Sequence, residues 1–210
     1  AGHSVTLNEP LRSTKIRLNS IDNIDCFKVN GTPADCVKLG IETLINFEPD
    51  IVVSGINDGA NMGYDVLYSG TVSAAIEGWM MGYTSIAISL NTESNRFFAT
   101  GAKYLNNILK AKLKDIINKK MLINVNIPDI APDKIEGIKI TSLSKCLYDD
   151  YYETRVDPMG NNYYWLAGEI KGKMKEDTDL WAIKNNMISI TPLKLDLTNN
   201  KEADFLKKLL

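Results

Sequence analysis

The chain alternates short apolar runs with longer stretches in which apolar residues recur every three or four positions. This pattern predicts an α/β fold, because strands inside a parallel sheet are continuously apolar and the helices that cover it are amphipathic. The predicted strands cover residues 51–53, 86–88, 122–127, 138–143 and 187–190, with short extended segments at 4–7, 11–18 and 26–29. The predicted helices cover residues 33–45, 72–81, 96–118, 178–185 and 201–210. Since residues 51–53 are apolar without alternation, we expect their strand to be buried on both faces.

The predicted helices carry signals at their ends and along their faces. Thr32 before Pro33 is an N-cap with proline at the first helical position, and Gly82 is a C-terminal stop. The expected buried stripes are Val37, Ile41, Leu44 and Ile45 in helix 33–45, and Phe98, Ala102, Leu105, Leu109, Leu113 and Ile116 in helix 96–118. Lysines occupy the opposite side of the longer helix, which indicates packing on the core with one solvated face.

A polar, glycine-rich stretch joins strand 51–53 to helix 72–81. It contains Gly55, Gly59 and Gly63, with Asn57, Asp58, Asn61 and Asp65 between them, and it ends in Ser69, Gly70 and Thr71 at the start of the helix. Ligands collect at the carboxyl ends of parallel strands, and a helix N-terminus attracts phosphate. Amide and carboxylate oxygens suit Mg²⁺ or Mn²⁺. The stretch therefore predicts metal-assisted phosphate chemistry.

Other interpretations of the same stretch stay open. An ordinary loop of turn residues followed by a helix cap explains the glycines alone equally well. The spacing is neither GxxxxGK[ST] nor GxGxxG, and no lysine lies between Pro49 and Thr71, so a metal would have to balance the charge of a bound phosphate. Asp58 and Asp65 are interpreted as turn or cap residues rather than as ligands.

Composition excludes several classes of function. The 210 residues carry a net charge of −2, which gives no support for a nucleic-acid polymer or an anionic membrane as partner. His3 is the single histidine, and the three cysteines lack the spacing of a zinc site, so neither a histidine-cluster metal site nor a Ser-His-Asp triad is expected. The scattered cysteines, the absence of an apolar run near 20 residues and the absence of a secretory leader pattern favour a cytoplasmic protein.

The segment from Tyr148 to Ile170 is rich in tyrosine and carries the turn sequence Asp157-Pro158-Met159-Gly160 at its centre. These features predict a long β-hairpin. Its aromatic residues could cover the core of the same domain, or they could form an arm that pairs with a second subunit.

Several motifs together resemble the SurE family, the survival-protein-E nucleotidases. The longest is SGINDGANMGYDVLYSGT at residues 54–71, and the others are GHSVTL at 2–7, GTPADCV at 31–37, INVNIP at 123–128, RVDPMGNNYYWL at 155–166, TD at 178–179 and SITPL at 189–193. The resemblance implies a three-layer, Rossmann-like α/β fold with a mostly parallel sheet and a protruding C-terminal hairpin arm. The implied regions are an α/β core at 1–145, the arm at 146–170, and a segment at 171–210 that completes the fold.

The resemblance also implies a reaction and a set of site residues. The expected enzyme is a phosphomonoesterase that uses a divalent metal, Mg²⁺ or Mn²⁺, to hydrolyse nucleoside 5′- and 3′-monophosphates, with some activity on short polyphosphate. Asn57 matches the metal-binding position of the family. Asn61, Ser69, Gly70 and Thr71 match its phosphate-contacting positions. The expected partner is a second copy of the chain, in a homodimer or homotetramer formed through the arm.

The sequence departs from the family pattern near its start. The other metal ligands of the family are an aspartate pair in an Asn-Asp-Asp-Gly motif and a serine just before the GHS motif, and neither occurs in these residues. The first strand and helix of the nucleotide-binding half are also missing, and a sheet without an inner strand has two unpaired edges. We therefore expect a partial chain with weak or no activity by itself. The alternatives are a non-catalytic nucleotide-binding protein and an assembly domain built around the arm.

Overall fold

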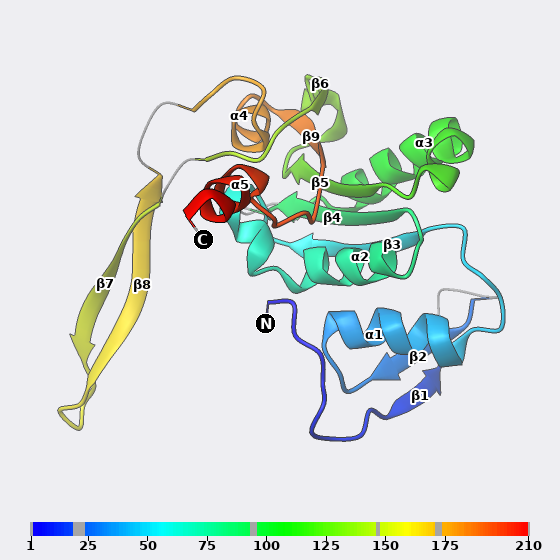
Figure 1. Cartoon of the computed structure of the whole chain (residues 1–210), viewed down its shortest axis with the longest axis horizontal. Helices are drawn as coiled ribbons and strands as arrows, with labels where there is room; N and C mark the ends of the chain where they lie inside the picture. The colour runs from blue at the N-terminus through cyan, green and yellow to red at the C-terminus, as the bar shows by residue number, and fades with distance from the viewer. Residues whose placement is uncertain (1, 19–23, 93–95, 146–147, 171–173, 210) are drawn as a thin grey trace.

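The computed structural model describes residues 2–18, 24–92, 96–145, 148–170 and 174–209. At its centre lies a five-stranded sheet with the order β3-β4-β5-β9-β6 (Figure 1). The strands are β3 (Val52–Asp58), β4 (Ser85–Asn91), β5 (Leu122–Pro128), β6 (Gly137–Ile140) and β9 (Met187–Pro192). β3, β4 and β5 are parallel, and β9 and β6 run in the opposite direction. The predicted mostly parallel sheet is confirmed.

Helices cover both faces of this sheet, which gives the predicted three layers. The helices are α1 (Pro33–Leu39), α2 (Gly70–Met80), α3 (Phe98–Ile116), α4 (Asp179–Lys184) and α5 (Asn200–Leu209), with the short turns η1 (Gly40–Leu44), η2 (Gly63–Leu67), η3 (Ile117–Lys119) and η4 (Pro132–Lys134). Phe98 and Leu105 of α3 pack on one face of the sheet. Val72 and Ala75 of α2 pack on the other face, against Ala87 and Leu122.

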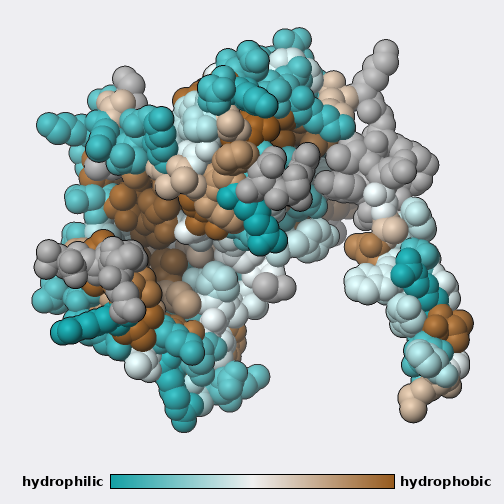
Figure 2. Space-filling model, turned by 180° about the vertical axis from the view of Figure 1, so that it is seen from behind, coloured by the Kyte–Doolittle hydropathy of each residue, from teal (hydrophilic) through white to brown (hydrophobic). Residues whose placement is uncertain are grey.

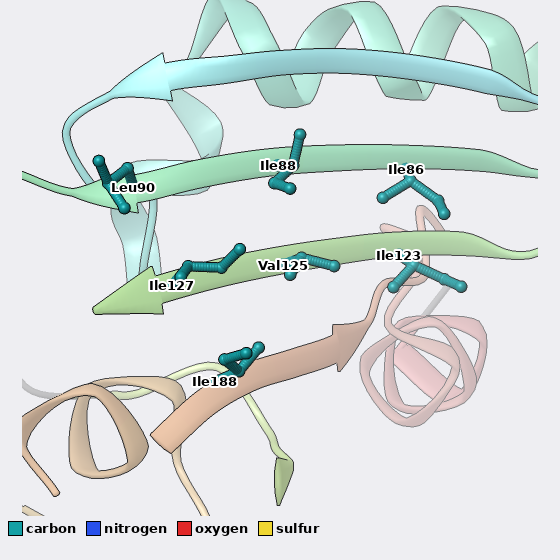
Figure 3. Packing of buried hydrophobic residues seen from close by; sticks show 7 residues of the cluster. All are labelled: Ile86, Ile88, Leu90, Ile123, Val125, Ile127 and Ile188. Carbon is teal, nitrogen blue, oxygen red and sulfur yellow. The ribbon is translucent and has the colours of Figure 1, made fainter. Parts of the chain in front are cut away.

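Alternate residues of β4, β5 and β9 form the larger core cluster. Figure 3 shows its buried members, which are Ile86, Ile88, Leu90, Ile123, Val125, Ile127 and Ile188. Each such side chain contributes about 1.5–3 kcal/mol when it is removed from water. The intervening residues of the same strands point to the α2 side, and several of them are buried and polar, namely Ser85, Ser89, Asn124 and Asn126. The face of the sheet under α2 is therefore partly polar.

The start of α2 follows from its sequence. The hydroxyl of Ser69 accepts a hydrogen bond of 3.1 Å from the N–H of Val72, which is the geometry of an N-cap. At the other end, Gly82 adopts a φ of +100°, which stops the helix. Both predicted boundaries are confirmed within one or two residues.

The prediction for β3 is wrong in two respects. The strand continues through Asp58, so residues 54–58 lie in the sheet rather than in a loop, with an irregularity of register between Ser54 and Asn57. β3 is also an edge strand among the described residues, because it pairs only with β4. Val53 is consequently 41% exposed and not buried. A local apolar run does not distinguish a central strand from an edge strand.

The N-terminal part forms a small unit of its own around the carboxylate of Asp35. β1 (Ser13–Ile16) and β2 (Cys26–Val29) make a separate antiparallel pair. Residues 4–7, predicted as extended, are not a strand; Thr6 instead donates to Asp35 from its N–H (3.0 Å) and from its hydroxyl (2.6 Å). Asp35 also accepts from the N–H of Thr32 at 2.8 Å and completes a capping box at the start of α1.

These hydrogen bonds keep the Asp35 carboxylate charged. Burial by itself would raise its pKa, but the hydrogen bonds from Thr6 and Thr32 outweigh the burial and lower the pKa from 3.8 to about 2. The predicted apolar stripe of this helix is only half-buried, and its fully buried residues are Ala34 and Asp35. Besides these hydrogen bonds, Lys38 of α1 pairs with Glu77 of α2 at 3.2 Å, so polar contacts and half-buried apolar residues together hold the helix.

The predicted hairpin is confirmed. β7 (Tyr148–Val156) and β8 (Asn162–Ile170) pair antiparallel along their whole length, and the carboxylate of Asp157 accepts from the N–H groups of Met159 and Asn161, each at 2.8 Å. The hairpin, which we call the arm, projects from the body of the molecule (Figures 1 and 2). Its exposed apolar side chains are Tyr151, Tyr152, Val156, Met159, Tyr163, Tyr164, Trp165 and Leu166. They do not cover the core, so of the two interpretations of the hairpin only the projecting arm agrees with the structure.

The strand expected at 138–143 ends at Ile140, and the expected stripe of α3 is buried only in part. α3 places Phe98, Leu105 and Leu109 against the core, whereas Ala102 is exposed. The side chains of the predicted residues Leu113 and Lys112 lie outside the described part. Cys26 and Cys36 are free thiols, and Cys146 is outside the described residues. Among the helices described, none is both long and apolar enough to cross a bilayer.

Candidate functional site

The structure brings Asn57 and Thr71 together although fourteen positions separate them. Asn57 lies near the carboxyl end of β3, and Thr71 is the second residue of α2. The hydroxyl of Thr71 donates to Oδ1 of Asn57 at 3.0 Å, and Nδ2 of Asn57 donates to the carbonyl oxygen of Gly59 at 2.8 Å. Both ends of the amide are thus oriented. Oδ1 keeps a second lone pair, because a carbonyl oxygen can accept twice.

The N-terminus of α2 provides the donors of the site. Gly70 and Thr71 are the first two helical residues, and the N–H groups of a first turn have no partner within their own helix. The helix dipole adds a partial positive charge at the same point. The Ser69 side chain is 92% buried and its hydroxyl oxygen already caps Val72, so its observed contact is structural. Gly70 and Thr71 are therefore the residues best placed to bind an anion.

Asn61 lies deeper than Asn57 and Thr71. Its Nδ2 donates to Oγ of Ser89 at 2.7 Å, and its side chain is almost fully buried. Its backbone N–H donates to Oδ1 of Asn126, and its carbonyl oxygen accepts from Nδ2 of Asn124 and of Asn126, all within 2.9 Å. Asn61 thus fixes the glycine-rich loop onto the polar face of the sheet. A direct contact between its side chain and phosphate stays a prediction.

Sequence reasoning missed the residues that hold this loop. Ser89, Asn124 and Asn126 occupy alternate positions in apolar strands, which is the signal that could have revealed them. Asp179 was also missed: this fully buried carboxylate accepts from the N–H of Gly63 at 2.8 Å. In both cases the partner is more than 25 positions away in the sequence. The alternation can therefore mark these residues as unusual, but it does not show which distant residue each of them contacts.

The remaining polar residues near the loop have other partners. Asp58 lies 3.4 Å from the guanidinium of Arg96, in an exposed ion pair. Nε2 of His3 lies 3.2 Å from the buried carboxylate of Glu77, which also pairs with Lys38 at 3.2 Å. Asp58 and His3 therefore each have a partner within the protein.

The described residues fit a divalent metal only in part. Oδ1 of Asn57 is a hard oxygen of the kind that Mg²⁺ and Mn²⁺ prefer. No group of three or more His, Cys, Asp or Glu among the residues described is close enough to hold an ion. Asn57 is one suitable ligand, but these residues alone do not complete a coordination shell.

Comparisons with known proteins identify the family of the chain. A sequence model of the family described as survival protein SurE matches residues 1–150. The chain is 43% identical over 209 residues to a 5′-nucleotidase SurE of Thermosipho africanus, covering 99% of this chain and 80% of that protein. It is 46% identical over 199 residues to a 5′-nucleotidase SurE of Moorella thermoacetica, covering 94% and 76%. Its fold is similar to the crystal structure of a SurE protein from Aquifex aeolicus, with a TM-score of 0.85 and 44% identity, over 99% of this chain and 83% of that one. Because these matches span most of the sequence, the chain belongs to the survival protein SurE family.

Proposed function

We propose that this chain carries the phosphate-binding site of a nucleotidase that hydrolyses nucleoside 5′-monophosphates to nucleoside and phosphate. The observation that carries the proposal is the contact of Asn57 with Thr71 at the junction of β3 and α2. The contact places an oriented amide oxygen beside the free donors of a helix N-terminus. Three relatives with the name 5′-nucleotidase SurE are 43%, 44% and 46% identical to it over 99%, 93% and 94% of the chain.

Each residue has a defined part in this proposal. The N–H groups of Gly70 and Thr71 hold the phosphate oxygens, and the helix dipole stabilises the charge that develops on them. Ser69 keeps the first turn of α2 in place through its cap. Asn61 holds the loop from below through Ser89, Asn124 and Asn126. Its Nδ2 carries two hydrogens, and the one that Ser89 does not accept would be its donor to phosphate.

A divalent ion, Mg²⁺ or Mn²⁺, is part of the proposal. Asn57 would be one of its ligands, and its remaining ligands would be groups other than the described residues. When bound, such an ion polarises a phosphoryl oxygen and lowers the pKa of water. We extend the proposal to nucleoside 3′-monophosphates and short polyphosphate, because the residues proposed here to bind substrate, Asn57, Gly70 and Thr71, would contact its phosphate group and not its ribose.

The proposal is tested by release of inorganic phosphate from AMP. With Mn²⁺ present we expect phosphate release above the rate without protein, and we expect EDTA to abolish it, because Asn57 and the helix terminus alone supply no Lewis acid. The same assay with 3′-AMP and with tripolyphosphate tests the broader substrate range. If EDTA left the rate of phosphate release unchanged, a divalent metal would be excluded from the reaction. Nucleotide binding without any hydrolysis would favour a non-catalytic binding protein.

We also propose that the arm joins copies of this chain into a homodimer or homotetramer. A lone two-stranded hairpin is marginally stable in water, and large exposed apolar patches mark interaction sites. Tyr152 and Leu166 are exposed cross-strand neighbours on one face of the arm. Replacing both residues by serine would remove apolar area from the proposed contact with a second copy of the chain.

This proposal predicts a change of molar mass in solution. By size-exclusion chromatography with light scattering, the wild type should elute as a dimer or larger, and the double variant Tyr152→Ser/Leu166→Ser should dissociate at micromolar concentration. The control variant Phe47→Ser/Met80→Ser removes two equally exposed apolar side chains outside the arm and should keep the wild-type mass. A monomeric wild type, or an unchanged mass in the arm variant, would contradict the arm as an interface.

A further inference from the structure

Asp179, the first residue of α4, is the most deeply buried carboxylate that the proposed reaction leaves without a role. Its relative exposure is 0%. Acidic side chains are rarely buried to this extent unless they are paired. Here the partners are three backbone N–H groups, each at 2.8 Å: Gly63 donates to Oδ2, and Ser144 and Leu180 donate to Oδ1. Hydrogen bonds to an ionised acceptor are the stronger kind.

These partners belong to distant parts of the chain. Gly63 opens η2, the single turn that leads from the glycine-rich loop to Ser69. Ser144 precedes the arm by four residues, and Asp179 follows it by nine. Both connections of the arm thus meet at this carboxylate. Two backbone hydrogen bonds join them there: Ser142 donates to the carbonyl oxygen of Asp177 at 2.9 Å, and Asp179 donates to that of Ser142 at 3.0 Å. We call residues 142–144 and 177–179 the arm root.

The loop also touches the arm root directly. Gly63 has a φ of +53°, and a Cβ added to it would lie 2.8 Å from the carbonyl oxygen of Ser144. There is therefore no room for a side chain between the loop and the root. Gly63 is thus held against the arm root in two ways, by its hydrogen bond to Asp179 and by this close backbone contact. We call this contact of Gly63 with the arm root the junction. Six residues beyond it lies Ser69, the cap of α2.

We infer that Asp179 is a positioning residue that ties the glycine-rich loop to the arm root, so that a disturbance of the arm reaches the phosphate-binding corner through this carboxylate. The inference rests on the hydrogen bonds of Gly63 and Ser144 to one carboxylate and on the close contact between Gly63 and Ser144, and the coupling is tested by a double-mutant cycle. Only the activity measurement below rests on the proposed function.

The variant Asp179→Asn tests the inference, because it keeps the shape of the side chain and turns one acceptor oxygen into a donor that faces an N–H group. We expect amide hydrogen exchange in peptides covering residues 60–68 to accelerate about tenfold or more, since a hydrogen bond to a charged group is lost. With AMP and Mn²⁺, kcat/KM should fall about tenfold, mainly in KM, because phosphate contacts shift while the chemistry is retained.

Asp35→Asn is the matched control. Asp35 is also almost fully buried and accepts backbone N–H groups, but its partners are Thr6 and Thr32. The comparison is made at a temperature where circular dichroism shows that Asp179→Asn and Asp35→Asn are both folded. There, the amide hydrogen exchange rates of residues 60–68 in Asp35→Asn should stay within about twofold of the wild-type rates. Gly63→Ala disturbs the same junction without touching the buried charge, and it should reproduce the fast exchange of Asp179→Asn.

The connection to the arm is tested by a double-mutant cycle. Tyr152→Ser/Leu166→Ser should change exchange at residues 60–68 in the wild-type background and add nothing further when combined with Asp179→Asn. If the arm substitutions and Asp179→Asn had additive effects on exchange at residues 60–68, the arm would not act on the loop through Asp179, and the inference would be wrong. Wild-type exchange at residues 60–68 in Asp179→Asn would overturn the positioning role itself. If the wild type does not hydrolyse AMP, the proposed function fails, while hydrogen exchange still decides whether Asp179 holds the loop.

Discussion

Replacement of Gly55 by alanine should destabilise the protein by about 2–6 kcal/mol, the sum of backbone strain and overpacking. Gly55 adopts a φ of +125° inside β3, a conformation that residues with a side chain rarely take. An added Cβ would collide with the carbonyl oxygen of Ile88 and lie 2.9 Å from its Cγ2. Ile88 is fully buried in the centre of β4 and cannot move aside. The measurement is the urea midpoint of unfolding, followed by circular dichroism.

Gly40→Ala provides the control for this substitution. Gly40 follows α1 with a helical φ of −56°, and an added Cβ would meet nothing within 4 Å. The change should be neutral or stabilising by up to about 1 kcal/mol, because alanine restricts the unfolded chain. Equal urea midpoints for the two variants would show that β3 tolerates a side chain at position 55.

Replacement of Asn57 by alanine should lower Mn²⁺-dependent hydrolysis of AMP by a hundredfold or more, roughly the effect of removing one preorganised group at a reacting centre. The variant loses the oxygen that accepts from Thr71 and the nitrogen that donates to Gly59. Thr71 is then free to rotate away from the helix N-terminus. The assay is phosphate release at saturating metal, with circular dichroism to show that the variant is folded.

The adjacent residue supplies the comparison for Asn57. Asp58→Asn removes an exposed ion pair with Arg96, and such pairs contribute roughly 0–1 kcal/mol. Its activity should stay within about twofold of the wild type, because the group lies outside the proposed contacts. If Asn57→Ala kept more than half of the activity, the corner formed by β3 and α2 would not be the reacting centre.

The features that could be predicted from the sequence are those that neighbouring residues determine. Thr32 and Pro33 start a helix through their own backbone geometry, and Asp157 closes the hairpin turn with bonds to residues two and four positions away. The grouping of Asn57 with the start of α2 was also expected, since a parallel strand and the following helix meet at one edge of the sheet.

The features that could not be predicted depend on pairs far apart in the sequence. An apolar run such as 51–53 occurs in edge strands and in central strands alike. Its exposure depends on how many strands pair with β3, and in the described part of the chain only β4 does. The hydrogen bonds of Asn61 could not be predicted from the loop sequence: its Nδ2 donates to Ser89, and its backbone groups pair with Asn124 and Asn126. A cluster of this kind is specified by three-dimensional packing and not by spacing.

The order of strands has a consequence for synthesis on the ribosome. β9 lies between β5 and β6, so β6 has no partner among the described strands until residues 187–192 have left the exit tunnel. Residues 141–186, including the arm, must be translated first, which takes several seconds at roughly 5–20 residues per second. During that interval the nascent chain exposes the open side of β5. Chaperones that bind extended apolar segments would find their target in this interval.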